Sequence, residues 1–234
     1  MKPLTHILTA ILLLRLAVAP ALAQDTLSTR TAPGPAPLLC SPVPASLMGL
    51  ALTAGASPMF VEPLRRQNIL VREEVQLWRR NRFDHRQLHF DDFLQLAPLA
   101  SVVLLEWCGV PSRHDGWPLL RRTAGTMLIT TAIVQPLKLC ITEWRPDRSA
   151  SNSFPSGHTA FAFSGAELLR LEYGDTSPWI PAAGFAVAAF TGFMRLYNDR
   201  HWTGDVLAGA AVGIISADIS FWLNNLIERK LWNR

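Results

Sequence analysis

Apolar residues gather into long stretches from about residue 93 onward. Five stretches cover about residues 93–110, 118–140, 155–171, 178–194 and 203–223. A helix that crosses a bilayer needs about 20 mostly apolar residues, and most of these stretches approach that length. Several contain proline, glycine or a single charge, which the interior of a membrane bundle tolerates. The pattern predicts an all-α fold, a polytopic transmembrane helical bundle with about five core spans.

The part of the chain before this bundle has a different character. Residues 1–23 carry an early lysine, an apolar run and an A-x-A site, which is typical of a cleaved signal peptide. Arg15 inside the run also fits an uncleaved N-terminal anchor. Residues 24–46, rich in Pro, Ala, Ser and Thr, predict a linker. Residues 47–92 predict an interfacial or periplasmic helical segment, and residues 93–228 form the bundle.

The distribution of basic residues predicts the orientation of the bundle. The C-terminal tail is basic, and the positive-inside rule places it in the cytoplasm. Counting back, the loops 141–154 and 196–202 emerge on the outer side, together with the start of the third stretch. The basic region 62–92 also falls on the outer side, against the rule. Polar residues of both loops should therefore meet at one end of the bundle.

Composition supports the membrane interpretation and excludes other classes. Charged residues make up 17%, below the roughly 25% of soluble domains. The net charge is +4, but no zinc-finger or RNA-binding motif is present, so no nucleic-acid partner is expected. The three cysteines contain no CxxC pair, which argues against a disulfide framework. His85 and His89 are a possible metal pair; without a third nearby ligand we interpret them as a solvated polar face.

Three cations lie at the outer end of the predicted bundle. Lys138 and Arg145 are seven residues apart, and two helical turns would place both on one face. Arg195 ends the fourth apolar stretch. Unpaired cations near lipid are costly, so the cluster indicates an anionic ligand. Phosphate fits best, because arginine binds it through planar paired donors and lysine as a point charge.

The segment Pro155-Ser156-Gly157-His158 opens the third apolar stretch. If a helix starts near Pro155, the free amides of Ser156, Gly157 and His158 form an anion site. Glycine lets the ligand approach the backbone, and the Ser156 hydroxyl can donate as well.

A second histidine has an acidic residue four positions later. If a helix begins near His201, the Asp205 carboxylate can fix one ring nitrogen and leave the other free to attack phosphorus. His158 then stands opposite as the general acid. The residues predict a two-step displacement through a phosphohistidine, with water attacking in the second step.

Small and aromatic residues complete the pattern. Gly209, Gly213 and Ala217 recur every four residues and predict close packing between membrane helices. Trp144 and Trp202 flank the polar residues and are expected to anchor the bundle at the membrane interface.

The three polar segments resemble the signature of the type 2 phosphatidic-acid phosphatase superfamily, KxxxxxxRP, PSGH and SRxxxxxHxxxD. The resemblance covers about residues 90–223. Met194 stands where the family usually has serine. The resemblance implies a helical bundle without a metal cofactor. It assigns phosphate binding to Lys138, Arg145, Ser156, Gly157 and Arg195, and catalysis to His158 as the acid, His201 as the nucleophile and Asp205 as its partner.

These patterns together predict a membrane phosphatase that needs no cofactor. The expected substrates are lipid phosphates such as phosphatidic acid, phosphatidylglycerophosphate, undecaprenyl diphosphate or lipid A phosphate. The expected place is the bacterial inner membrane with the site facing the periplasm, in preference to the outer membrane. One alternative is a periplasmic non-specific acid phosphatase acting on soluble phosphate esters. Another is a non-enzymatic membrane scaffold or transport protein. The oligomeric state stays open.

Overall fold

The computed structural model describes residues 62–82 and 90–232, all within the second of the chain's two units, residues 48–234. This part of the chain contains α-helices and no β-strand, so the all-α prediction is confirmed. The predictions for residues 1–23, for residues 24–46 and for His85 and His89 lie outside the described residues. The helices are α3 (Glu62–Arg82), α4 (Asp91–Leu94), α5 (Ala97–Trp107), α6 (Trp117–Cys140), α7 (Gly157–Tyr173), α8 (Trp179–Tyr197) and α9 (Thr203–Trp232).

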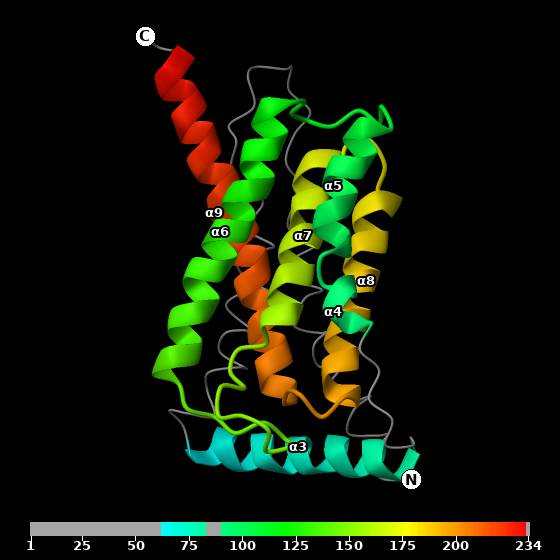
Figure 1. Ribbon diagram of the computed structural model, residues 1–234, viewed down its shortest axis with the longest axis vertical. Coiled ribbons are helices and arrows are strands. Elements are labelled where there is room, and N and C mark those ends of the chain that lie inside the picture. The colour runs from blue at the N-terminus through cyan, green and yellow to red at the C-terminus, as the bar shows by residue number, and fades with distance from the viewer. Residues whose placement is uncertain (1–61, 83–89, 233–234) are drawn as a thin grey trace, which may run out of the picture. The chain divides into compact units, whose positions relative to one another are not determined.

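Helix α7 is the centre of the bundle, with α5, α6, α8 and α9 packed around it (Figure 1). Most of its residues are buried, and many of them are small, so the neighbouring helices can approach closely. At one end, Leu99, Val102, Leu119, Leu168 and Tyr173 form an apolar core between α5, α6 and α7. A central helix that is buried on most of its sides is expected where a bundle surrounds it.

The predicted small-residue stripe of α9 lies against α7. A methyl group on Gly209 would overlap the carbonyl oxygen of Ser156, and one on Gly213 would overlap that of Ala160. Ala217 is fully buried on the same side. The helix axes can come this close only because no side chain stands between them. The predicted close packing is confirmed.

Each of the five predicted apolar stretches contains a helix of the bundle. By length and composition, α8 and the Thr203–Lys230 part of α9 could cross a membrane. The first stretch is divided into α4 and the 11-residue α5, since Pro98 lies in the first turn of α5, where proline favours a new helix start. Helix α6 has 24 residues but carries Arg121, Arg122 and Lys138.

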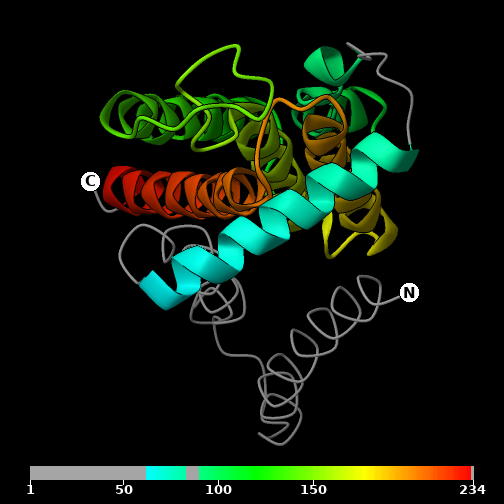
Figure 2. The ribbon, with the colours of Figure 1, turned by 90° about the horizontal axis from the view of Figure 1, so that it is seen from below.

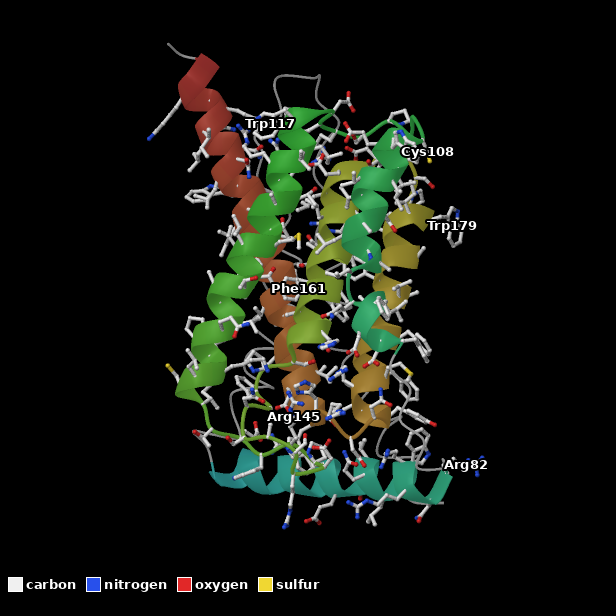
Figure 3. The ribbon with its side chains drawn as sticks, viewed as in Figure 1. Arg82, Cys108, Trp117, Arg145, Phe161 and Trp179 are labelled. Carbon is white, nitrogen blue, oxygen red and sulfur yellow. The ribbon has the colours of Figure 1, made fainter. Side chains whose placement is uncertain are left out.

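The connections between helices form two separate ends. At one end, the amide of Ser156 donates to the carbonyl of Asp205 at 2.9 Å, which joins the start of α7 to the start of α9. At the other end, the amide of Arg113 donates to the carbonyl of Glu172 at 2.8 Å. Figure 3 shows Arg145 at the first end and Trp117 and Trp179 at the second. The loops 141–154 and 196–202 therefore share one end, as predicted.

Helix α3 lies across the end that carries these two loops (Figures 1 and 2). Arg79 Nε donates to the carbonyl oxygen of Tyr197 at 2.6 Å, and its Nη1 pairs with Asp199. Arg72 pairs with Glu143 at 2.5 Å and lies over the Trp202 ring. Within the predicted segment 47–92, the structure describes α3, and this helix contacts both polar loops.

Candidate active site

Lys138 and Arg145 do not share a helix face, contrary to the prediction. Helix α6 ends at Cys140, and Ile141 continues in an extended conformation, so Arg145 lies in the following loop. That loop folds back through a bridge between Glu143 and Asn152. Lys138 Nζ donates to the Asn152 carbonyl at 2.9 Å, and Arg145 Nη2 donates to its side-chain oxygen at 3.2 Å. The loop rather than the helix brings the two cations together.

The start of α7 differs in detail from the prediction. The helix begins at Gly157, with Ser156 as its N-cap and its hydroxyl oxygen 3.4 Å from the Thr159 amide. The Ser156 amide donates to Asp205 and is not free, so only the Gly157 and His158 amides remain to serve an anion. A methyl group on Gly157 would lie 3.7 Å from Lys138 Cε. The helix start therefore faces the first cation of the cluster.

His201 and Asp205 meet as their spacing predicted, although α9 begins at Thr203, two residues later than expected. His201 Nδ1 lies 3.5 Å from Asp205 Oδ2, and both side chains are buried. The Ser153 hydroxyl donates to Asp205 Oδ2 at 2.5 Å and lies 3.4 Å from His201 Nδ1. The Trp202 amide also donates to this carboxylate oxygen, at 2.9 Å. Because Nδ1 faces Asp205, Nε2 is the nitrogen available for attack.

Burial and the surrounding positive charges favour the neutral imidazole of His201. Burial lowers the pKa of His201 well below its ordinary value, and the positive charges of Lys138, Arg195 and Arg145 lower it further. A neutral imidazole has the lone pair that a nucleophile needs. These charges come from three segments: Lys138 from α6, Arg145 from the loop after α6 and Arg195 from α8. The structure therefore brings the three predicted phosphate-binding cations near the predicted nucleophile.

Each of the two predicted phosphate-binding arginines has one nitrogen without a hydrogen-bond partner among the described residues. Arg195, on α8, is buried and pairs through Nη1 with Asp91. Within the described part of the chain, Arg195 Nε and Arg145 Nε are buried and have no hydrogen-bond partner. Buried donors without a partner are rare, because each costs the free energy of desolvation. Phosphate binding by both arginines stays a prediction.

His158 lies at the start of α7 and contacts a residue that the sequence analysis did not select. Its Nε2 lies 2.8 Å from Asp92 Oδ1. Met194, in the position of the family's usual serine, is 3% exposed. It packs in the interior, so it does not replace that hydroxyl in a polar contact.

Four residues of the site were missed: Asp91, Asp92, Asn152 and Ser153. The two acids were visible only as part of a charged region before the first apolar stretch. Asn152 and Ser153 lie directly before the FPSGH segment and look like ordinary loop residues. Among the described residues, no group of three or more His, Cys, Asp or Glu side chains is placed to hold a metal ion.

Comparison with known proteins gives a family match over the same region. Residues 120–228 match the PAP2 superfamily. The chain is 44% identical over 140 residues to a lipid A 1-phosphatase of Porphyromonas gingivalis, covering 59% of this chain and 32% of that protein. It is 32% identical over 80 residues to a probable diacylglycerol pyrophosphate phosphatase of Schizosaccharomyces pombe, covering 30% and 29%. The chain thus spans about a third of the length of these curated relatives.

A similar solved structure is the PAP2-type phosphatidylglycerolphosphate phosphatase of Bacillus subtilis, a transmembrane protein. It is 18% identical, and the match covers 79% of this chain and 96% of that one with a TM-score of 0.49.

Proposed function

On the premise that residues 120–228 match the PAP2 superfamily, we propose that this chain is a membrane lipid phosphatase acting through a phosphohistidine. The observation that carries the proposal is the position of His201. Its Nδ1 faces Asp205, it is buried, and the charges of Lys138, Arg145 and Arg195 act on it from three segments. A neutral imidazole among three cations suits attack on a phosphate group.

In the first step, His201 Nε2 attacks phosphorus and the bond from phosphorus to the leaving oxygen breaks. Asp205 stabilises the positive charge that develops on the imidazole, and Ser153 holds that carboxylate in place. The three cations and the Gly157 amide bind the phosphate oxygens. His158 gives its proton to the leaving oxygen, so an alcohol departs and the phosphate stays on His201.

In the second step, water attacks phosphorus and the bond between phosphorus and nitrogen breaks. His158, now without its extra proton, accepts one from the water. Inorganic phosphate leaves, and both histidines return to their starting states. Asp205 keeps the His201 ring in the same orientation throughout, because its oxygen is also fixed by the Trp202 amide.

A lipid phosphate is the substrate class that an apolar cavity in the bundle and the names of the relatives favour. A cavity of about 340 Å³ lies between α5, α7 and α8. Its lining is almost entirely apolar and runs from Ala97 and Pro98 to Cys108, which lies toward the end of the bundle opposite the site (Figure 3). This size and character suit an acyl chain. The two curated relatives are named for lipid A and for diacylglycerol pyrophosphate, which are both lipid phosphates.

The proposed location is the bacterial inner membrane, with the site on the periplasmic side. Trp107, Trp117 and Trp179 are strongly exposed at the end opposite the site, where aromatic residues would lie at a membrane interface. Trp144 is 61% exposed at the catalytic end, which suits the second interface. The basic C-terminal end of α9 favours the cytoplasmic side for the end away from the site.

Phosphate release from purified protein tests this function. The panel contains phosphatidic acid, phosphatidylglycerophosphate, undecaprenyl diphosphate, lipid A and a soluble phosphate ester. We expect turnover of at least one lipid, and we expect His201→Ala to lose at least about 1,000-fold in kcat. Full activity in His201→Ala would refute the mechanism.

Extraction from the membrane distinguishes the proposal from a soluble acid phosphatase. We expect the protein to stay in the membrane through carbonate and high-salt washes and to be released by detergent. Release by the washes, with turnover of the soluble ester alone, would support the soluble enzyme instead.

A further inference from the structure

The predicted general acid has a carboxylate partner of its own. His158 Nε2 lies 2.8 Å from Asp92 Oδ1, in a pair that resembles the one between His201 and Asp205. The preceding residue, Asp91, pairs with Arg195 Nη1 and accepts from the Asn198 side chain at 3.3 Å. Two adjacent acids therefore contact two different parts of the proposed machinery, and neither belongs to a motif of the family signature quoted above.

The two carboxylates are held in place by the packing of α4. This helix contacts α5, α7 and α8. The Phe90 ring, directly before it, stacks on Phe190 of α8 with centroids 6.0 Å apart. Asp91 is 1% exposed, whereas the Asp92 side chain is 52% exposed. Asp91 is thus fixed in the interior, while the Asp92 side chain is half exposed beside His158.

The contact with Asp92 has a chemical consequence for His158. A ring nitrogen that donates to a carboxylate is fixed in orientation, and the carboxylate stabilises the doubly protonated ring. Nε2 faces Asp92, so Nδ1 is the nitrogen that can pass a proton to the leaving oxygen. Arg195 Nη1 lies 3.7 Å from the same Asp92 oxygen, which links the acid to the phosphate-binding arginine.

We propose that Asp92 is the positioning residue of the general acid His158, and that Asp91 positions Arg195 for the phosphate. The inference rests on the proposed phosphatase function and deepens it. The two acids therefore have different roles. Asp92 supports proton transfer from His158 to the leaving group, and Asp91 supports phosphate binding by Arg195.

The dependence of rate on the leaving group tests the role of Asp92. We compare an alkyl phosphate with p-nitrophenyl phosphate through kcat/KM, which reports formation of the phosphohistidine and not its hydrolysis. For Asp92→Asn we expect a loss of about 100-fold on the alkyl ester, since proton transfer contributes about 100- to 10,000-fold. We expect a loss below about threefold on p-nitrophenyl phosphate, because its stable phenolate departs without a proton. Asp92→Glu should recover part of the alkyl activity.

Asp91→Asn should behave differently on the same two substrates. We expect about the same loss, roughly 10-fold or more, on both esters, because a misplaced Arg195 weakens every phosphate contact. Inhibition by inorganic phosphate should weaken to a similar degree. Asp175→Asn is the matched control: it lies at the opposite end of the bundle with its side chain 81% exposed, and its kcat/KM should equal that of the unchanged protein.

A spectroscopic measurement separates this inference from the function on which it rests. The chain has six histidines, and ¹⁵N-histidine spectra identify His158 by the signal lost in His158→Gln. We expect a proton fixed on Nε2, and a mixture of ring forms in Asp92→Asn. Absence of turnover on any ester would reject the phosphatase function, while the spectra would still test the pair. An unchanged His158 spectrum, or equal loss on both esters in Asp92→Asn, would overturn the proposed role of Asp92.

Discussion

At the scale of single residues, the neutral state of His201 leads to a prediction about pH. Burial and the charges of Lys138, Arg195 and Arg145 hold the pKa of His201 well below its ordinary value, which is about 6.5. A lowered pKa means that the neutral nucleophile persists as the pH falls through that value. We therefore expect the acid limb of kcat/KM to lie below pH 6.5.

Replacing Lys138 by Gln removes one of these charges and should move the acid limb to higher pH, besides lowering the rate. The phosphate group of the substrate also ionises near pH 6, but equally for both proteins, so the shift between their profiles is the measurement. Lys230→Gln, an exposed change at the far end of α9, is the control. An identical acid limb in the Lys138 variant would contradict this electrostatic account.

At the scale of helices, the contact between α7 and α9 links packing to catalysis. Gly209 lies against the Ser156 carbonyl and Gly213 against that of Ala160. A methyl group at either place forces the helices apart, and overpacking of this kind costs about 1–3 kcal/mol. We expect Gly209→Ala and Gly213→Ala to lower Tm in detergent to a similar extent. Only Gly209→Ala should also lower kcat/KM, because it displaces the start of α7, where Ser156 and Gly157 lie.

Helix α3 gives a second prediction at this scale. Arg79 is 8% exposed and holds the carbonyl of Tyr197 and the carboxylate of Asp199. These residues begin the loop that carries His201. We expect Arg79→Met to lower kcat about 10-fold, since hydrogen bonds to charged groups contribute about 1.5–3 kcal/mol each and their loss loosens the loop.

The rate of trypsin cleavage gives an independent measure of how firmly this loop is held. In Arg79→Met, cleavage after Arg200, followed by mass spectrometry, should be faster than in the unchanged protein. Arg80→Met is the control, because Arg80 is the exposed neighbour on the same helix. If both variants behave alike, α3 does not support the loop.

At the scale of the whole molecule, the sequence predicted what depends on local pattern and missed what depends on distant contacts. The apolar stretches located the five bundle helices, and the alternation of their ends placed Lys138, His158 and His201 together. The pairs of His158 with Asp92 and of Arg195 with Asp91 join residues 66 and 104 positions apart. The periodicity of apolar residues along the sequence does not indicate contacts between residues so far apart. The position of Arg145 in a loop was missed because a spacing of seven residues in the sequence does not show whether the chain between Lys138 and Arg145 is helical.

The two ends of the bundle also divide catalysis from stability, which gives the last prediction. Opposite the site, Arg122 is fully buried, donates to Glu228 at 2.9 Å and lies 3.7 Å from the buried Glu172. His114 contacts Glu172 at 3.0 Å. Removing one partner of a buried ion pair leaves an uncompensated charge and costs about 3–5 kcal/mol. We expect Arg122→Met to lose stability of this order, seen as a lower Tm in detergent.

The same variant should keep its catalytic constants, because the site residues lie at the other end of α6, α7 and α9. Once the folded fraction is measured by size-exclusion chromatography, kcat and KM per folded molecule should match those of the unchanged protein. Arg113→Met is the control for stability, because Arg113 pairs with an exposed carboxylate and such pairs contribute about 0–1 kcal/mol. A lower kcat in folded Arg122→Met would show that the polar network at this end acts on the site through the bundle, and the separation of catalysis from stability would be wrong.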